Sequence, residues 1–183
     1  PLEHLPSSLS QLTRLKHLSL LGGRLSALPE SLGKLSSLQT LTLPGNRLTQ
    51  LPASLASLKG LESLDLGENL LSSLPDSLGA IKALKRLNVY ANRLQSLPEG
   101  IGGLENLLHL DAKGNALQTL PTSIGKLTKL ENLQVGQNKL TALPSEIGGL
   151  KNLQRLSLSG NALKELPSSL GKLSALTSLD VSD

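Results

Sequence analysis

Apolar residues recur along this chain with a spacing that changes within each stretch of 23 residues. The first part of a stretch alternates, as in Leu64-Asp65-Leu66, and alternation predicts a short strand with one apolar face. An Asn follows, then Leu-x-x-Leu-Pro, and then apolar residues three or four apart. This second spacing indicates an irregular or short 3₁₀ return, where proline removes no ladder donor. Each stretch therefore predicts one strand and one return.

The stretches are copies of one unit. Eight prolines from Pro6 to Pro167 and six asparagines from Asn46 to Asn161 each recur every 23 residues. Counted from Leu15, a unit reads L-x-x-L-x-L-x-x-N-x-L-x-x-L-P-x-x-(L/I)-G-x-L-x-x. Because no insertion interrupts this period, we expect residues 1–183 to form a single array. It comprises seven full repeats, 15–175, and a partial repeat at each end.

Stacking gives these units their stability, because a three-residue strand cannot stand alone. Eight stacked strands predict a parallel sheet with about 4.8 Å between neighbours. The return is wider than the strand, so the stack should bend with the strands on its concave side. Each Asn carries donors and an acceptor that can satisfy backbone groups beyond the reach of water, which predicts an asparagine ladder. Gly23 takes the Asn position in the first unit.

The unit resembles the leucine-rich repeat over the whole chain, and the segment 130–140, LENLQVGQNKL, carries every consensus position. The 23-residue form with L-P-x-x-I-G-x-L is similar to intracellular Ras-group-related repeats and to repeats of secreted bacterial effectors. The resemblance implies an α/β solenoid. It would be a curved horseshoe with a concave parallel sheet and irregular or 3₁₀ convex returns. It also implies a module that binds a partner protein on the concave face.

Strand residues that alternate with the core leucines should project from the concave face. The third positions of the units hold His17, Thr40, Ser63, Arg86, His109, Asn132, Arg155 and Ser178. The fifth positions hold Ser19, Thr42, Asp65, Asn88, Asp111, Gln134, Ser157 and Asp180. Large and charged residues gather in the middle units, and Tyr and Arg are enriched in binding hot spots. The candidate partner-binding residues are Arg86, Tyr90, His109, Asp111 and Lys113, with Asp65 and Glu68 one unit earlier and Leu21 near the N-terminal end.

Other chemistry finds little support in the sequence. The chain has no Cys, and His17 and His109 should lie about 19 Å apart, so we expect no metal site. Asp65 and Asp111 should lie about 10 Å apart on an open sheet without a deep pocket, so we expect no catalytic site, no cofactor and no small-molecule ligand. The net charge is +4, but interleaved aromatic residues are absent, so we do not expect nucleic-acid binding. No apolar run is long enough to span a membrane.

Two other functions stay open at this point. Several effectors with similar repeats carry a separate catalytic domain, so the array is alternatively the substrate-recognition part of a larger enzyme such as a bacterial effector ubiquitin ligase. It is also alternatively an engineered repeat scaffold, although irregular choices such as Pro44, Leu70 and Ala112 argue against a pure consensus design. Localisation is not assigned. The lack of Cys favours an intracellular protein, or one secreted into a host cell, over a disulfide-capped extracellular receptor.

Overall fold

The computed structural model describes residues 2–182, in which short strands alternate with short 3₁₀ helices. Pro1 and Asp183, the ends of the predicted array, lie outside the described residues. The strands are β1 (His17–Ser19), β2 (Thr40–Thr42), β3 (Ser63–Asp65), β4 (Arg86–Asn88), β5 (His109–Asp111), β6 (Asn132–Gln134), β7 (Arg155–Ser157) and β8 (Ser178–Asp180). The helices are η1 (Ser7–Gln11), η2 (Glu30–Lys34), η3 (Ala53–Ser57), η4 (Asp76–Ala80), η5 (Glu99–Gly103), η6 (Thr122–Lys126), η7 (Ser145–Gly149) and η8 (Ser168–Lys172).

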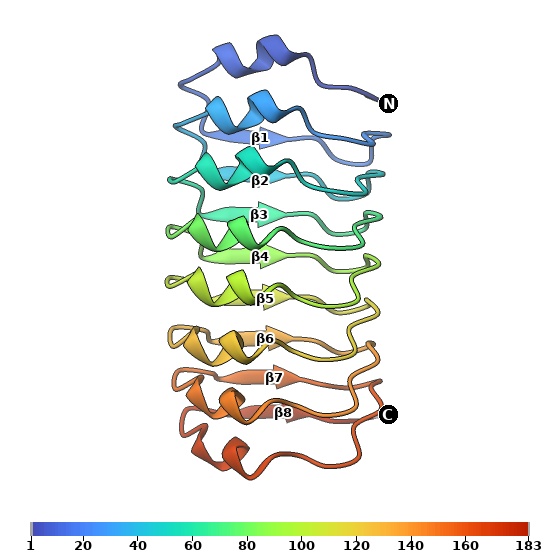
Figure 1. The fold of residues 1–183 in the computed structure, drawn as a ribbon, viewed down its shortest axis with the longest axis vertical. Coiled ribbons are helices and arrows are strands. Elements are labelled where there is room, and N and C mark those ends of the chain that lie inside the picture. The colour runs from blue at the N-terminus through green and yellow to red at the C-terminus, as the bar shows by residue number, and fades with distance from the viewer. Residues whose placement is uncertain (1, 183) are drawn as a thin grey trace.

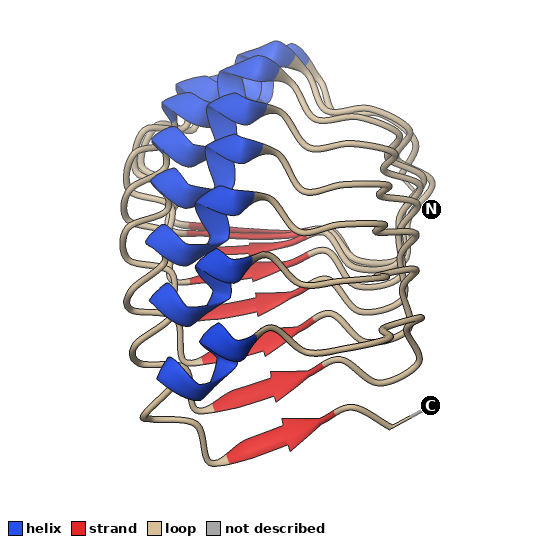
Figure 2. Ribbon diagram, turned by 60° about the horizontal axis from the view of Figure 1, so that its bottom comes forward, coloured by secondary structure: helices blue, strands red, loops and turns tan. Residues whose placement is uncertain are grey.

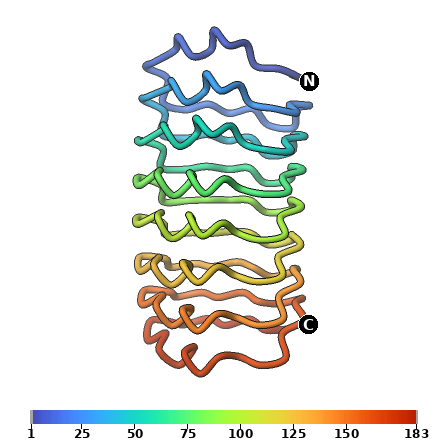
Figure 3. Tube along the Cα trace, in the orientation of Figure 1, coloured from blue at the N-terminus to red at the C-terminus, as the bar shows by residue number. Residues whose placement is uncertain are grey.

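The strands form one parallel sheet in the order of the chain, from β1 to β8 (Figure 1). Each strand pairs with the next at equal repeat positions, so that Leu87 lies opposite Leu64 on one side and Leu110 on the other. These central leucines are buried, whereas the residues before and after them in each strand face away from the core. The trace advances by one turn per unit, and the two termini lie toward opposite ends of the stack (Figure 3).

The helices form the second layer and cover the core from the side opposite the sheet (Figure 2). Each begins directly after a proline such as Pro98, whose extended backbone (φ −70°, ψ 152°) suits the residue before a helix. The third residue of each inner helix is a buried Leu or Ile, for example Ile101 in η5. The predicted fold is confirmed: an open, curved solenoid with a parallel sheet on one side and 3₁₀ returns on the other.

Asparagine side chains tie the second to the seventh full unit each to the unit before it. Asn69, which is 4% exposed, accepts a hydrogen bond from the Leu48 N–H at 3.0 Å. Its Nδ2 donates to the carbonyl oxygens of Leu43, Leu66 and Gly67, each at 3.0 Å. Asn161 makes three such bonds near the C-terminal end but is only half-buried. These amides satisfy backbone groups that the short strands leave without partners.

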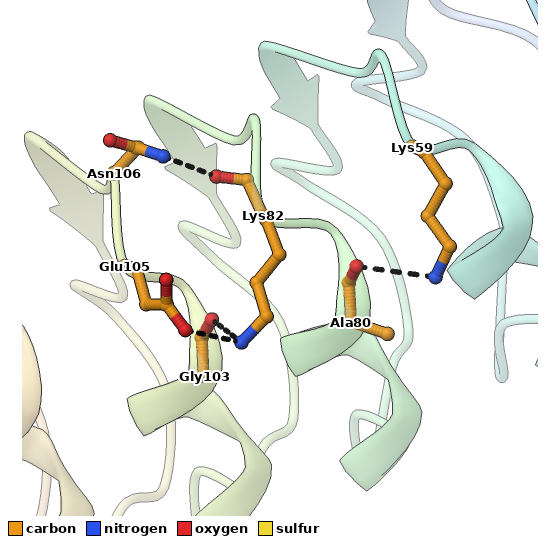
Figure 4. Close-up of polar contacts among 6 residues, drawn as sticks. All are labelled: Lys59, Ala80, Lys82, Gly103, Glu105 and Asn106. Atoms are coloured by element: carbon orange, nitrogen blue, oxygen red, sulfur yellow. Dashed lines mark hydrogen bonds and ion pairs between the residues drawn. The ribbon is translucent and has the colours of Figure 1, made fainter.

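A second set of inter-unit contacts follows the edge where each helix leads back to a strand (Figure 4). Lys82 donates to the Gly103 carbonyl oxygen at 2.9 Å and pairs with Glu105 at 2.7 Å. Asn106 in turn donates to the Lys82 carbonyl oxygen at 2.8 Å. Lysine side chains therefore reach the carboxyl end of the next helix, where a positive charge is favourable.

Candidate functional site

The exposed face of the sheet is hollowed over four consecutive strands, β3 to β6. The hollow has a volume of about 340 Å³. It brings together four of the residues predicted from the sequence, namely Asp65, Arg86, His109 and Asp111. Arg86 is exposed, and the other three are half-buried. The remaining polar side chains of the hollow are those of Ser63, Asn88, Asn132 and Gln134.

Hydrogen bonds hold the two carboxylates in place. The Oδ1 atom of Asp65 accepts from the Gly67 N–H at 3.0 Å and from Asn88 Nδ2 at 2.9 Å. The Oδ1 atom of Asp111 accepts from the Lys113 N–H at 3.0 Å. Within residues 2–182, neither Oδ2 atom takes part in a hydrogen bond or ion pair. Each carboxylate therefore has one oxygen committed to the fold and one available to a ligand.

The two carboxylates also influence each other. Partial burial raises the pKa of Asp111 above its ordinary value of 3.8, and the negative charge of Asp65 raises this pKa further. The Lys113 N–H and the Lys113 ammonium act in the opposite direction but do not outweigh the burial. Asp111 thus keeps its negative charge at a cost in free energy, which a cationic ligand would reduce.

The ion pairs of the described chain lie away from this hollow. Lys82 pairs with Glu105 and Lys85 pairs with Glu62, while Arg24 lies 3.6 Å from Glu3 near the N-terminal end. In the part of the chain from residue 2 to residue 182, no ion pair involves the charged residues of the hollow. The charges of these two lysine–glutamate pairs are therefore balanced within the molecule, whereas the charged residues of the hollow have no such partner among residues 2–182.

Three other predicted residues lie beyond the carboxyl ends of the strands. Tyr90 and Lys113 lie two residues after the ends of β4 and β5, and the Tyr90 carbonyl oxygen accepts from the Glu68 N–H at 2.8 Å. Tyr90 is half-buried, and its ring lies beside Gly114 of the next unit, where an added Cβ would be 3.7 Å from Tyr90 Cε2. Glu68, Tyr90 and Lys113, here called the strand-end cluster, adjoin the hollow without lining it. Leu21, which is 66% exposed, follows β1 and belongs to neither group.

Sequence reasoning did not select the neutral members of the hollow. Asn88 is the clearest case, because it donates to Asp65 and accepts from the Tyr90 N–H at 2.9 Å. It thus joins the hollow to the strand-end cluster. Asn88 occupies the same repeat position as the selected Asp65 and Asp111, and that shared position is the only signal that could have identified it.

A larger hollow, of about 480 Å³, lies on the helix side between η5 and η8. Its floor is glycine-rich because neighbouring helices pack too closely for side chains. A Cβ on Gly148 would lie 2.7 Å from the Ser169 carbonyl oxygen. Of its two carboxylates, Glu99 already accepts hydrogen bonds from the Thr122 and Ser123 N–H groups, and Glu146 accepts from the Ser145 hydroxyl at 3.1 Å. Helix packing explains this larger hollow, and we assign the candidate site to the sheet.

The described residues, 2–182, contain neither a metal-binding cluster nor a membrane-spanning helix. Among residues 2–182, no three His, Asp or Glu side chains are grouped closely enough to hold a metal ion. No helix in the described range combines the length and the apolar character that crossing a bilayer requires.

Solved structures with this architecture come from several sources. A leucine-rich repeat protein of Leptospira interrogans is 34% identical over 99% of this chain, with a TM-score of 0.74. The leucine-rich repeat domain of the type III effector XopL is 29% identical over 98%, with a TM-score of 0.77. The ectodomain of the plant receptor kinase GASSHO1/SCHENGEN3 from Arabidopsis thaliana is 31% identical over 98%, with a TM-score of 0.69. The chain spans 52%, 73% and 26% of these structures' own lengths, respectively.

Family models give the same assignment from the sequence. A leucine-rich repeat region model matches residues 3–93, and a leucine-rich repeat model matches residues 82–140 and 128–183. Comparison with curated proteins gives no significant match. Because the family models run through all the repeats and the solved structures share the solenoid, the chain belongs to the leucine-rich repeat family.

Proposed function

We propose that this chain is a protein-interaction module that binds a partner protein on the concave face of its sheet, at the hollow over β3 to β6. The observation that carries the proposal is the set of charged groups converging there, Asp65, Arg86 and Asp111, which have no ion-pair partner within residues 2–182. A partner with complementary charges would provide the ion pairs that these groups lack within the described residues. The strand-end cluster would extend the contact on one side.

The shape and chemistry of the hollow favour a protein over a small molecule. Small-molecule sites are mostly enclosed and apolar. This hollow is open to solvent, and it is lined by charged or hydrogen-bonding side chains such as those of Arg86, Asn88 and His109. Solenoid proteins commonly use extended concave surfaces for binding, and leucine-rich repeats are typically non-catalytic protein-interaction modules.

One structural relative supports the same assignment. The Arabidopsis receptor kinase ectodomain was solved in complex with CASPARIAN STRIP INTEGRITY FACTOR 2. Its similarity to this chain extends over 98% of the chain, which includes β3 to β6. A fold of this kind therefore takes part in a complex in at least one relative. We extend that binding role to the present chain.

Affinity capture followed by titration of the purified partner tests the proposal. Arg86→Ala removes an exposed charge from the hollow, and Lys126→Ala removes one from the helix side as the matched control. We expect Arg86→Ala to weaken binding by about tenfold, the effect of losing an interfacial anchor, and Lys126→Ala to leave the affinity unchanged. Circular dichroism of both variants checks that the fold is retained. A partner whose binding depends on Lys126 and not on Arg86 would contradict the concave assignment.

A further inference from the structure

Charges on the strands of the concave face are sorted into two rows. Because the strands pair at equal repeat positions, all third-position residues line up across the sheet, and so do all fifth-position residues. The third-position row holds Arg86, Arg155 and two histidines and has no acidic residue. The fifth-position row has no basic residue, and its charged members are Asp65, Asp111 and Asp180. The rows are two residues apart along the strands, about 6.6 Å.

The charges also alternate from strand to strand. Asp65 lies on β3, Arg86 on β4 and Asp111 on β5, so a path across the sheet meets negative, positive and negative groups in turn. Each step crosses one strand, about 4.8 Å, and changes row. The arrangement is a zigzag whose axis runs along the stack, perpendicular to the strands.

An extended polypeptide has the matching symmetry. Its successive side chains point to opposite sides, so alternating basic and acidic residues present all positive charge on one edge and all negative charge on the other. Two residues advance about 6.6 Å, while Asp65 and Asp111 lie two strand steps, about 9.6 Å, apart. Flexible arginine or lysine side chains can span the difference of about 3 Å.

We propose that the concave face of β3 to β5 binds an extended protein segment in which basic and acidic residues alternate, and that the segment runs along the stack. Its basic side chains meet the free Oδ2 atoms of Asp65 and Asp111, and the acidic side chain between them meets the Arg86 guanidinium. Asn88 lies between the two carboxylates and holds Asp65 in position through its 2.9 Å hydrogen bond. This inference rests on the proposed function and specifies the kind of partner that the face accepts.

Three synthetic peptides of equal length test the charge order. One fluorescently labelled peptide alternates arginine and glutamate, a second carries the same residues in two blocks, and a third has serine in place of every charge. Binding is measured by fluorescence anisotropy at about 50 mM salt, where screening is weak. We expect the alternating peptide to bind about fivefold more tightly than the block peptide, as one or two partly exposed ion pairs would give.

Variants locate the effect. The double change Asp65→Asn/Asp111→Asn keeps both Oδ1 acceptors, as the natural Asn88 does at the same repeat position, and should weaken binding of the alternating peptide about fivefold or more. Glu146→Gln on the helix side removes one negative charge, half the change of the double variant, and should leave the affinity unchanged. Equal affinities for the alternating and block peptides would overturn the inference. So would no gain over the serine peptide, or equal losses in the Asp and Glu variants.

A neutral steric variant separates this inference from the proposed function. Asn132→Phe places a bulky side chain in the hollow without altering its charge. If it abolishes peptide binding while charge order has no effect, concave binding stands and the alternating-charge inference falls. If neither the steric change nor charge order affects a bound peptide, the inference falls and the hollow is not the site that peptide uses.

Discussion

Replacement of Asn69 by alanine is expected to lower the free energy of unfolding by about 3 kcal/mol. The amide is 4% exposed and makes four hydrogen bonds. Three of these bonds go to the carbonyl oxygens of Leu43, Leu66 and Gly67. After the substitution, these oxygens still accept hydrogen bonds from Asn46, Asn92 and the Gly45 N–H, respectively. The Leu48 N–H has no other partner in the described structure. Its burial without an acceptor costs about 1–3 kcal/mol, and the lost bonds add to that cost.

Asn161→Ala provides the comparison from the end of the stack. Asn161 makes three equivalent bonds but is half-buried, so water can replace part of what the amide supplied. We expect a loss of about half that of Asn69→Ala. Asn132→Ala serves as the control, because this exposed-face Asn only accepts from Gln134 Nε2 and should cost less than about 0.5 kcal/mol.

Urea unfolding followed by far-ultraviolet circular dichroism measures all three variants, and hydrogen exchange reports on the Leu48 amide directly. Circular dichroism is the suitable probe because the chain has no Trp and a single Tyr. We expect the Leu48 amide to lose protection in Asn69→Ala before its neighbours do. An equal or greater loss of stability in Asn161→Ala would refute the argument that burial of the amide sets the cost.

Three further changes test the structure elsewhere. Ala91→Gly should stabilise the protein by about 0.5–1 kcal/mol in urea unfolding, because Ala91 holds a left-handed backbone (φ 50°) that costs a non-glycine residue about 1–2 kcal/mol, partly offset by the greater unfolded-state entropy of Gly. Asp111→Asn should also stabilise at neutral pH. Burial raises the pKa of Asp111 in the folded state, so the wild type should lose stability relative to this variant as the pH rises above 3.8. If the two proteins differ in free energy of unfolding by the same amount at pH 3.8 and at pH 7, the burial argument is contradicted. Ser169→Ala should leave thermal stability unchanged or raise it slightly, because the buried Ser169 hydroxyl has no hydrogen-bond partner in the described structure.

The repeat arithmetic was sufficient to predict the strands and their parallel stacking. Leu64, Leu87 and Leu110 occupy one position of a 23-residue unit, and an uninterrupted repeat leaves only one register in which all of them enter the same core. The left-handed turn after each strand was not predicted. Seven described units have this turn, and only four of them carry the Gly that would indicate it. At Glu68, Ala91 and Gln137 the stacked neighbours impose the same backbone on residues that disfavour it.

The candidate site depended on both the sequence and the tertiary structure. The sequence by itself determined that Asp65, Arg86, His109 and Asp111 face the same way on neighbouring strands, because side-chain direction follows from strand alternation and the repeat period. Only the tertiary structure decided which of the selected side chains line the hollow. Tyr90 and Lys113 follow the same strands, yet they lie beyond the strand ends, and the Tyr90 ring lies beside Gly114. Side-chain rotation and packing against the next unit are not periodic, so the arrangement of this site could be read only from the folded stack.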